Sequence, residues 1–436
     1  MFSITNVAKT SCSKKKRTYP LTEEQQRLVE IAQDKRGSTA YNESITFELR
    51  GRLAIDRLRN ALQTVIHRHD ALRTSIGSDG FHQIVTPVLD IEIPLLDYSS
   101  EDAPDEALNK WLLAESQQPF DLYQEPLVRA TIVKLSPERY AFNICIHHLV
   151  SDGWSLVAIL EEISKIYSGC LDIPPIQQFT DYLQWYNQDT QSDTFKTSEL
   201  FWSEHLRTVS PLRLPLDYSE PKQRTYQGSR ISIQIPSDLT LALKQRSMAW
   251  NATLFHTLLG AYAHQMTQFC QQNTIMIGIS VSGRPTHLAE HLVGYCSHFI
   301  PIYLKTDENS TWNQQVQRTK AALSQAFKHQ NVPFARILGQ LPQEKQQNQI
   351  QVTFNLDMTM AIDLVDLQAQ IIPQPVTSAR YAMGLNVIPE LDRLHFDFDY
   401  NTDYFKAETM QEFLVNLIEL LQGALTDSGL TDNHYI

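Results

Sequence analysis

The chain of 436 residues is long enough for two lobes of roughly 200 residues each, and its 42% hydrophobic and 20% charged residues are typical of a globular protein. Its net charge of −12 argues against nucleic acid as the main partner, and the absence of an apolar run of about 18 residues excludes a predicted transmembrane helix. The basic cluster at 14–17 has no apolar stretch behind it, so it is no secretory signal. Residues 1–18 are expected to form a disordered lead.

The cysteines indicate the redox compartment. They are odd in number and scattered, without the CxxC spacing of a zinc site, at Cys12, Cys145, Cys170, Cys270 and Cys296. This usage predicts a reducing cytoplasm and no structural zinc.

Residues 19–185 are predicted to form an N-terminal lobe in which helices and strands surround one sheet. Thr22 followed by Gln25 is the pattern of a capping box that opens a helix. Apolar periodicity predicts helices over 23–32, 54–69, 105–117 and 153–167, and strands over 44–50, 81–87, 127–135 and 140–146. Residues 168–178 are rich in Gly, Asp and Pro and predict a loop before a helix at 179–188.

Residues 186–436 are predicted to form a C-terminal lobe of the same α+β class. Helices are expected over 199–206, 237–249, 253–269, 311–328 and 407–425, and strands over 230–235, 274–281, 299–305, 349–358, 384–389 and 395–400. No short repeat occurs, which excludes a solenoid. Two lobes of similar size predict a substrate cleft between them.

The most informative motif is HHxxxDG, from His147 to Gly153. It follows the predicted strand 140–146 and precedes the predicted helix 153–167, so its side chains are held by regular structure on both sides. A histidine has the proton affinity of a general base near neutral pH, and the glycine permits a tight turn. A buried Asp152 would need a cationic partner, and Arg68 and Arg73 are candidates, although a solvated helix end is the simpler interpretation of that segment.

Further segments join this motif, and together they resemble the condensation domains of non-ribosomal peptide synthetases, of the chloramphenicol acetyltransferase-like superfamily, from about Tyr19 to about Thr426. Residues 147–155 match HHxxxDGWS in full. The other similar segments are 21–28 for the first signature, 68–74 for the second with Asp for Glu, 119–129 for the lead-in to the histidines, 179–185 for the fourth, 293–295 for the fifth and 329–334 for the sixth.

Two departures bear on the substrate. The fifth signature continues as Cys296-Ser297-His298 where the family has an Asn-Thr pair, and the seventh, at 352–357, is weak. Gly-Tyr-Cys-Ser-His and the segment Ala40–Ser44 are similar to condensation domains that receive acyl chains from polyketide modules. The resemblance therefore leaves the donor open between a polyketide or fatty acyl group and a peptidyl group.

The resemblance implies two chloramphenicol acetyltransferase-like lobes in a V-shaped pseudo-dimer with a central tunnel. It implies that a donor acyl thioester and an acceptor amine arrive on phosphopantetheine arms of two carrier proteins and form an amide. His148 is expected either to remove the amine proton or to hold the amine and steady the tetrahedral intermediate. His147 is expected to be structural, Asp152 to pair with Arg68, Arg73 or Arg284, and the Gly153 N–H to donate to an oxyanion or to hold the loop.

The remaining expectations concern the tunnel, the ligands and competing activities. Trp154 and Ser155 are candidate tunnel residues, with core packing equally open for Trp154, and Trp202 is expected to pack in the core. No metal or bound cofactor, no nucleic acid and no membrane is expected, and the chain is expected to be a monomer or part of a larger synthetase. Cyclisation and epimerisation are disfavoured by the intact HHxxxDGWS. A free-standing acyltransferase, an ester-forming activity and a non-catalytic docking domain remain alternatives.

Overall fold

The computed structural model describes residues 15–425 apart from 171, 173, 175, 208–209, 220, 222, 289–290, 308 and 341–349. Most of the expected disordered lead lies outside this range. The expectation was wrong for its last residues, because Lys16 pairs with Glu125 at 2.9 Å and strand β1 (Arg17–Pro20) runs antiparallel to β4 (His82–Val85).

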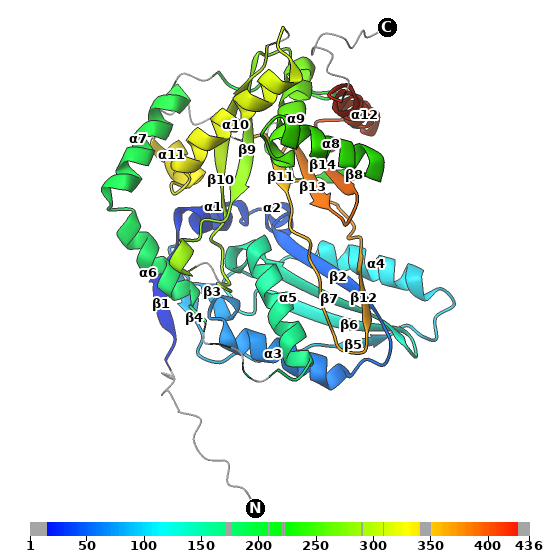
Figure 1. Cartoon of the computed structure of the whole chain (residues 1–436). Coiled ribbons are helices and arrows are strands. Elements are labelled where there is room, and N and C mark those ends of the chain that lie inside the picture. Colours follow the sequence, from blue (N-terminus) through cyan, green and yellow to red (C-terminus); the bar gives the residue numbers. More distant parts are fainter. Residues whose placement is uncertain are drawn as a thin grey trace, which may run out of the picture.

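The first half of the chain is built on a five-stranded sheet in the order β12-β2-β7-β6-β5. Strand β7 is buried along almost its whole length, which explains its nearly continuous apolar sequence. Helices α3 and α5 pack on one face and α4 on the other (Figure 1). The remaining elements are α1 (Glu23–Ile31), α2 (Lys35–Thr39), β2 (Asn42–Arg50), α3 (Ile55–Arg68), β3 (Thr74–Ile76), β5 (Leu95–Asp97), α4 (Pro104–Ser116), β6 (Val128–Ser136), β7 (Arg139–His147), α5 (Gly153–Tyr167) and α6 (Phe179–Asp189).

The second half is built on a six-stranded sheet in the order β10-β9-β11-β13-β14-β8. Helices α8, α9, α10 and α12 gather on the side of this sheet away from the first half (Figure 1), where Phe398 stacks on Phe413 of α12. The elements are α7 (Asp193–Arg207), β8 (Gly228–Ile235), α8 (Ser237–Ala249), α9 (Leu254–Cys270), β9 (Thr274–Val281), β10 (His298–Lys305), α10 (Trp312–Lys328), α11 (Phe334–Gln340), β11 (Val352–Leu356), β12 (Gln368–Ile372), β13 (Met383–Pro389), β14 (Leu394–Asn401) and α12 (Ala407–Gly423).

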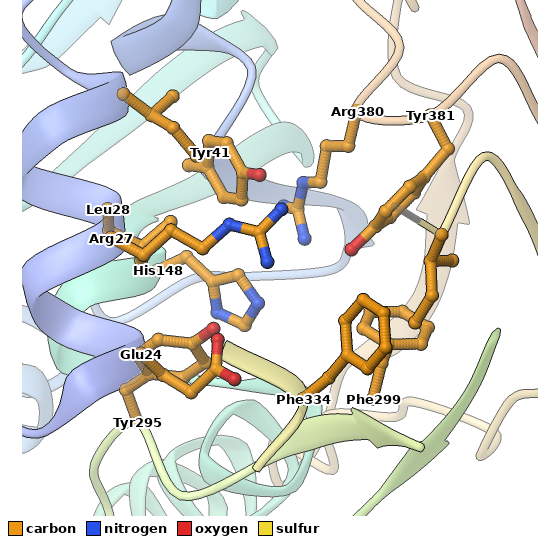
Figure 2. Close-up of a pocket in the computed structure, with 12 residues that line it drawn as sticks. Glu24, Arg27, Leu28, Tyr41, His148, Tyr295, Phe299, Phe334, Arg380 and Tyr381 are labelled. Carbon is orange, nitrogen blue, oxygen red and sulfur yellow. The ribbon is translucent and has the colours of Figure 1, made fainter. Parts of the chain in front are cut away.

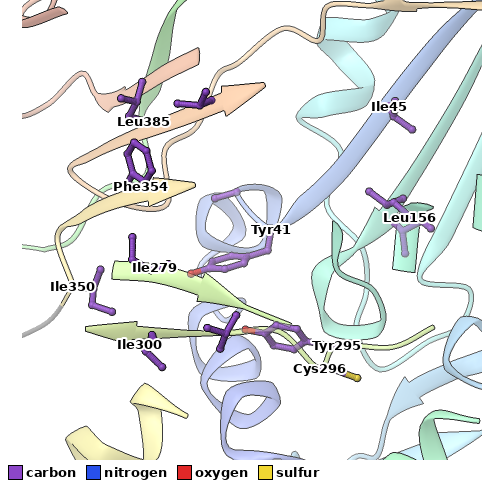
Figure 3. Close-up of a cluster of buried hydrophobic side chains, with 14 of the residues drawn as sticks. Tyr41, Ile45, Leu156, Ile279, Tyr295, Cys296, Ile300, Ile350, Phe354 and Leu385 are labelled. Carbon is purple, nitrogen blue, oxygen red and sulfur yellow. The ribbon is translucent and has the colours of Figure 1, made fainter. Parts of the chain in front are cut away.

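The two halves share structure, so a boundary between 185 and 186 does not separate them. That boundary falls inside α6. After β11 the chain leaves the second sheet, and β12 pairs antiparallel with β2, with Gln368 opposite Arg50 and Ile372 opposite Thr46 (Figure 1). One buried hydrophobic cluster likewise includes Ile45 and Leu156 of the first half and Ile300 and Leu385 of the second (Figure 3).

The α+β class is confirmed, and so are most of the expected elements. The capping box at Thr22 and Gln25 is present, and α5, α8 and β9 have the expected bounds. The expected strand 349–358 is shorter, since β11 covers Val352–Leu356 and residue 349 lies outside the described part of the chain. Strands β1, β3, β5 and β12 and helices α2 and α11 were not predicted, because they are short or lack apolar periodicity.

Candidate active site

The signature segments interlock around the HHxxxDG loop. Gln25 in α1 donates from Nε2 to the carbonyl of Leu149, 3.1 Å away. Asp70 accepts the N–H of Phe179 at 3.0 Å and the hydroxyl of Thr180 at 2.7 Å, so it holds the start of α6. Segments far apart in sequence therefore fix one another close to the loop.

The loop begins where β7 ends. Strand β2 pairs with β7 so that Asn42 lies opposite His147, and the N–H of His148 donates to the carbonyl of Tyr41 at 2.8 Å. A 3-10 helix over His148–Val150 then leads to Asp152, which caps α5. The backbone of His148 is thus anchored to a central strand pair.

The ring of His148 has a defined tautomer. Its Nδ1 lies 2.7 Å from the carbonyl oxygen of Ser151, which can only accept, so Nδ1 carries the proton. The ring packs at 4.6 Å from Tyr295 and at 6.2 Å from Tyr41, measured between centroids. Burial lowers the pKa of His148, and the nearby Glu43 carboxylate opposes this shift by raising the pKa. The buried ring is therefore neutral at physiological pH, with the lone pair on Nε2.

His148 lines a pocket to which both halves of the chain contribute (Figure 2). The pocket contains two guanidinium groups, one carboxylate and a set of aromatic and aliphatic side chains. Its residues are Glu24, Arg27, Leu28, Ile31, Tyr41, His148, Tyr295, Phe299, Phe334, Ile350, Arg380 and Tyr381. This mixture of apolar walls with a few converging polar groups is typical of a substrate site.

His147 differs from His148 in its hydrogen bonds and in its place relative to the pocket. Its side chain is fully buried, its Nδ1 accepts the N–H of Leu149 at 3.1 Å, and its ring lies edge-on to Phe120 at 6.0 Å. Burial lowers its pKa to about 3. His147 is not among the residues that line the pocket, and its contacts are those of a packing residue that supports the loop.

Asp152 lies at the centre of a buried ion pair. Its two oxygens accept from Nη2 and Nη1 of Arg284 at 2.7 and 2.8 Å, and both side chains are almost fully buried. The same carboxylate accepts backbone N–H groups of Ser155 at 2.9 Å, Cys296 at 3.1 Å and Ser297 at 2.9 Å. Arg284 and these donors outweigh the desolvation of the carboxylate and lower the pKa of Asp152 to about 2. The pair joins the start of α5 to two loops of the second half.

Gly283 and Gly294 lie in the two loops that the ion pair joins to α5, and neither position has room for a side chain. Gly283 has φ +63°, and a Cβ there would come within 1.9 Å of the carbonyl oxygen of Cys296. A Cβ on Gly294 would meet the ring of Phe179 at 2.2 Å. Glycine thus lets the Arg284 loop and the fifth signature approach each other closely enough for the ion pair to form.

The other two arginines considered for Asp152 have different partners. Arg68 pairs with Glu162 at 3.0 Å and also donates to the carbonyl of Pro174 at 2.9 Å. Arg73 donates to the carbonyls of Ile66 at 3.1 Å and Pro87 at 3.0 Å. Both stabilise the turn after α3, and the candidate assignment of either to Asp152 is corrected to Arg284.

Trp154 and Ser155, which follow Asp152, lie in different surroundings, and their expected place in a tunnel stays a prediction. Trp154 is 50% exposed on the surface of α5, so it belongs neither to the pocket nor to the core. Ser155 is buried, and its hydroxyl joins the ion pair through Asp152 at 2.8 Å and the Gly294 carbonyl at 3.0 Å. Trp202 is in the core and donates to the carbonyl of His329 at 2.8 Å.

Gly153 begins α5, so its N–H is one of the N-terminal donors that an α-helix leaves unpaired internally. A Cβ added to Gly153 would meet no atom within 4 Å. The backbone is therefore open on that side, unlike Gly283 and Gly294.

Two further findings concern the described residues as a group. They contain no set of three or more His, Cys, Asp or Glu side chains placed to hold a metal ion. None of their helices has both the length and the apolar character to cross a bilayer.

The family model for the condensation domain matches residues 15–435. The chain belongs to the condensation-domain family. It is 28% identical over 415 residues to Bacitracin synthase 3 of Bacillus licheniformis, an alignment that covers 93% of this chain and 6% of that synthetase. The chain thus spans a small part of this relative's length.

Solved structures support the fold. The X-domain in its complex with OxyB from teicoplanin biosynthesis has a TM-score of 0.82 and 21% identity, covering 95% of each chain. A mutant of the starter condensation domain of rhizomide synthetase RzmA, in complex with C8-CoA and Leu-SNAC, has a TM-score of 0.81 and 20% identity over 96% of this chain and 97% of that one. These likenesses show that the chain has the fold of condensation domains.

Sequence reasoning missed several residues that face His148. Tyr295 lies in the fifth signature, and Tyr41 and Glu43 lie in a segment noticed only for its similarity to polyketide-linked domains. Arg380 and Tyr381 lie in the loop before β13, where no motif pointed to them. Their placement depends on the crossing segment that contains β12, which the sequence pattern did not predict.

Proposed function

We propose that this chain joins a carrier-bound acyl thioester to an amine acceptor on a second carrier protein, with His148 at the reacting centre. The observation that carries the proposal is the orientation of the His148 ring: Nδ1 is occupied by the Ser151 carbonyl, which leaves the Nε2 lone pair for the substrate. In this reaction the amine nitrogen bonds to the thioester carbon, the C–S bond breaks, and the amine proton passes through Nε2 to the leaving sulfur.

Two roles for His148 fit this geometry. As a general base, Nε2 takes the amine proton during attack; as a positioning group, it accepts a hydrogen bond from the amine while the thioester supplies the reactivity. The Gly153 N–H is proposed to donate to the oxyanion of the intermediate, because it lies at a helix N-terminus with open space beside its Cα. Asp152 and Arg284 are proposed to hold this loop rather than to touch substrate.

The donor is proposed to be a polyketide or fatty acyl group. This rests on the Gly-Tyr-Cys-Ser-His variant and the Ala40–Ser44 segment, and it is in keeping with a fold neighbour that was solved with C8-CoA. The phosphopantetheine arms belong to the carriers, so the chain itself is proposed to need no resident cofactor. Ester formation with a hydroxyl acceptor would use the same groups.

The test is product formation followed by mass spectrometry of intact carriers. An octanoyl-loaded donor carrier is mixed with a panel of aminoacyl carriers and free amines, using the wild type, His148→Ala and the control His67→Ala. His67 is a half-exposed histidine of α3 that pairs with Asp90, so its loss should leave the rate unchanged. A new amide that requires His148 supports the proposal, and its acceptor shows whether the amine is carrier-bound or free.

A docking role is the competing outcome. The X-domain, which shares this fold, was solved in a complex with OxyB. Absence of product from every pair, with both carriers loaded and the protein folded, would contradict condensation activity and favour such a role.

A further inference from the structure

A carboxylate that belongs to neither the HHxxxDG motif nor the Asp152 ion pair lies beside His148. Glu43 is the second residue of β2, and one of its oxygens, Oε1, is 3.5 Å from Nδ1 of His148. The pairing of β2 with β7 brings it there, since Asn42 is opposite His147 and Glu43 is opposite Ile146. The Glu43 side chain is 15% exposed, so its charge is only weakly screened by solvent.

Glu43 is held in place from the second half of the chain. Nη2 of Arg380 lies 3.4 Å from Oε1 of Glu43, and Nε of Arg380 donates to the carbonyl of Ala40 at 2.9 Å. The Arg380 guanidinium also lies over the Tyr41 ring, 4.9 Å from its centroid. Arg380 therefore has a fixed position between β2 and the pocket, which it lines together with His148 (Figure 2).

The second oxygen of Glu43 distinguishes this carboxylate from Asp152. Oε2 of Glu43 is buried and has no hydrogen-bond partner among the described residues, whereas both oxygens of Asp152 are occupied by Arg284 and backbone N–H groups. A buried carboxylate with spare hydrogen-bonding capacity responds strongly to a new positive charge nearby. Such a charge appears on His148 if Nε2 takes a proton.

We propose that Glu43 is a positioning residue for His148: its carboxylate, held by Arg380, favours the Nδ1–H tautomer that the Ser151 carbonyl fixes, and it stabilises the imidazolium that forms when Nε2 takes a proton. Arg380 opposes that stabilisation because it places a cation near the same ring, so the pair sets how basic His148 is. This inference deepens the proposed function and rests on it for its catalytic meaning. It favours the general-base role of His148 over simple positioning of the amine.

The surroundings of His148 contain other charged and titratable groups that bear on the test. These groups are Glu24 and Arg27 of α1, Tyr295 of the loop before β10, Tyr41 beside β2, Arg380 and Tyr381 before β13, and His147 and Asp152 of the motif. Asp152 is neutralised by Arg284, and the pKa values of Tyr295 and Tyr381 are raised by burial, so these tyrosines stay neutral. Glu43 and Arg380 are the charges whose removal should move the titration of His148 in opposite directions.

The experiment is an NMR titration of the protein labelled with ¹⁵N in its histidine rings, without substrate. The His148 signals are identified by their loss in His148→Gln. In the wild type they should show the Nδ1–H tautomer. Glu43→Gln should move the His148 midpoint to lower pH, because the carboxylate favours the charged ring. Arg380→Gln should move it to higher pH, because a repelling cation is removed.

The matched control is Glu48→Gln. Glu48 lies on the same strand but pairs with Arg139 and Arg50, so its loss should leave the His148 midpoint unchanged. Thermal melts of each variant confirm that it is folded over the pH range used. Equal midpoints in the wild type, Glu43→Gln and Arg380→Gln, or a His148 ring that keeps one protonation form in all three, would overturn the inference.

The rate measurement completes the test. In single-turnover condensation, Glu43→Gln should lower the plateau rate about tenfold, a fraction of the whole general-base effect, and move the acid limb of the pH profile to lower pH. Since the titration uses no substrate, the two failures are separable. Equal midpoints overturn the Glu43 inference whatever the activity, whereas shifted midpoints with wild-type condensation in His148→Ala overturn the proposed function.

Discussion

Both carboxylate oxygens of Asp152 are bound by the guanidinium of Arg284, a residue 132 positions away in the other half of the chain. The charge of Asp152 is therefore fully paired, and Asp152 contributes to the site by holding the loop that carries His148. Nδ1 of His148 donates to Ser151, the residue directly before Asp152, so movement of this loop would also move the ring.

Removing one member of this pair should destabilise the fold. Asp152→Ala leaves the Arg284 guanidinium buried without its anion, and breaking a buried pair in this way costs about 3–5 kcal/mol. Chemical denaturation monitored by tryptophan fluorescence measures the change. The control is Arg52→Gln, which removes a strongly exposed pair with Glu138 and should change the free energy of unfolding by less than about 1 kcal/mol. Similar losses in the two variants would contradict the structural role of the buried pair.

The Asp152–Arg284 pair also predicts how the free energy of unfolding depends on pH. The pKa of Asp152 is about 2 in the folded chain and about 3.9 in an unfolded one, so its contribution is fully present above the unfolded value. It is lost as the pH falls through about 4 towards 2, and it amounts to roughly 2 kcal/mol. The difference in unfolding free energy between the wild type and Asp152→Asn should narrow from pH 5 to pH 3. The other acidic groups cancel in this difference, so a constant gap would show that the carboxylate charge is not what stabilises the loop.

Substitutions of the two adjacent histidines, His147 and His148, should have different effects on rate and stability. His148→Ala removes the ring that lines the pocket and should lower the condensation rate by about 10²–10⁴-fold, the usual range for a general base. His147→Ala removes a fully buried ring and the acceptor for the Leu149 N–H, and it should cost about 2–4 kcal/mol of stability. At a temperature where both variants are folded, His147→Ala should retain most of its rate per folded molecule. A rate loss equal to that of His148→Ala would assign His147 a direct role.

The local parts of this fold could be predicted from the sequence, and the long-range parts could not. Helix α5 has the predicted bounds because apolar spacing and the capping Asp152 both mark its start. Strand β12 was missed because Gln368, Ala369 and Gln370 are exposed and polar or small, so the strand has no alternating apolar pattern. It exists because the edge of β2 offers unpaired backbone groups.

The same division applies to the site. The motif identified His148 and Asp152 directly, since both lie within seven consecutive residues. The partner of Asp152 remained one of three arginines until the fold placed Arg284 beside it and gave Arg68 to Glu162. Glu43 and Arg380 were not identified as site residues, because only the pairing of β2 with β7 and the path of the segment before β13 bring them to the His148 ring.

Gly153 offers a test of how closely the substrate approaches the backbone. A Cβ at this position meets nothing within 4 Å, and its φ is not in the left-handed region, so Gly153→Ala should stabilise the protein by about 0.4–1 kcal/mol through the unfolded chain. Gly423→Ala at the end of α12 has similarly open space and should give a stability gain of the same sign with no effect on rate. If the thioester oxygen approaches the Gly153 N–H, the added methyl group narrows that approach, and Gly153→Ala should lower the condensation rate while raising the melting temperature. A more stable variant with an unchanged rate would show that the substrate does not use the empty space beside the Gly153 Cα.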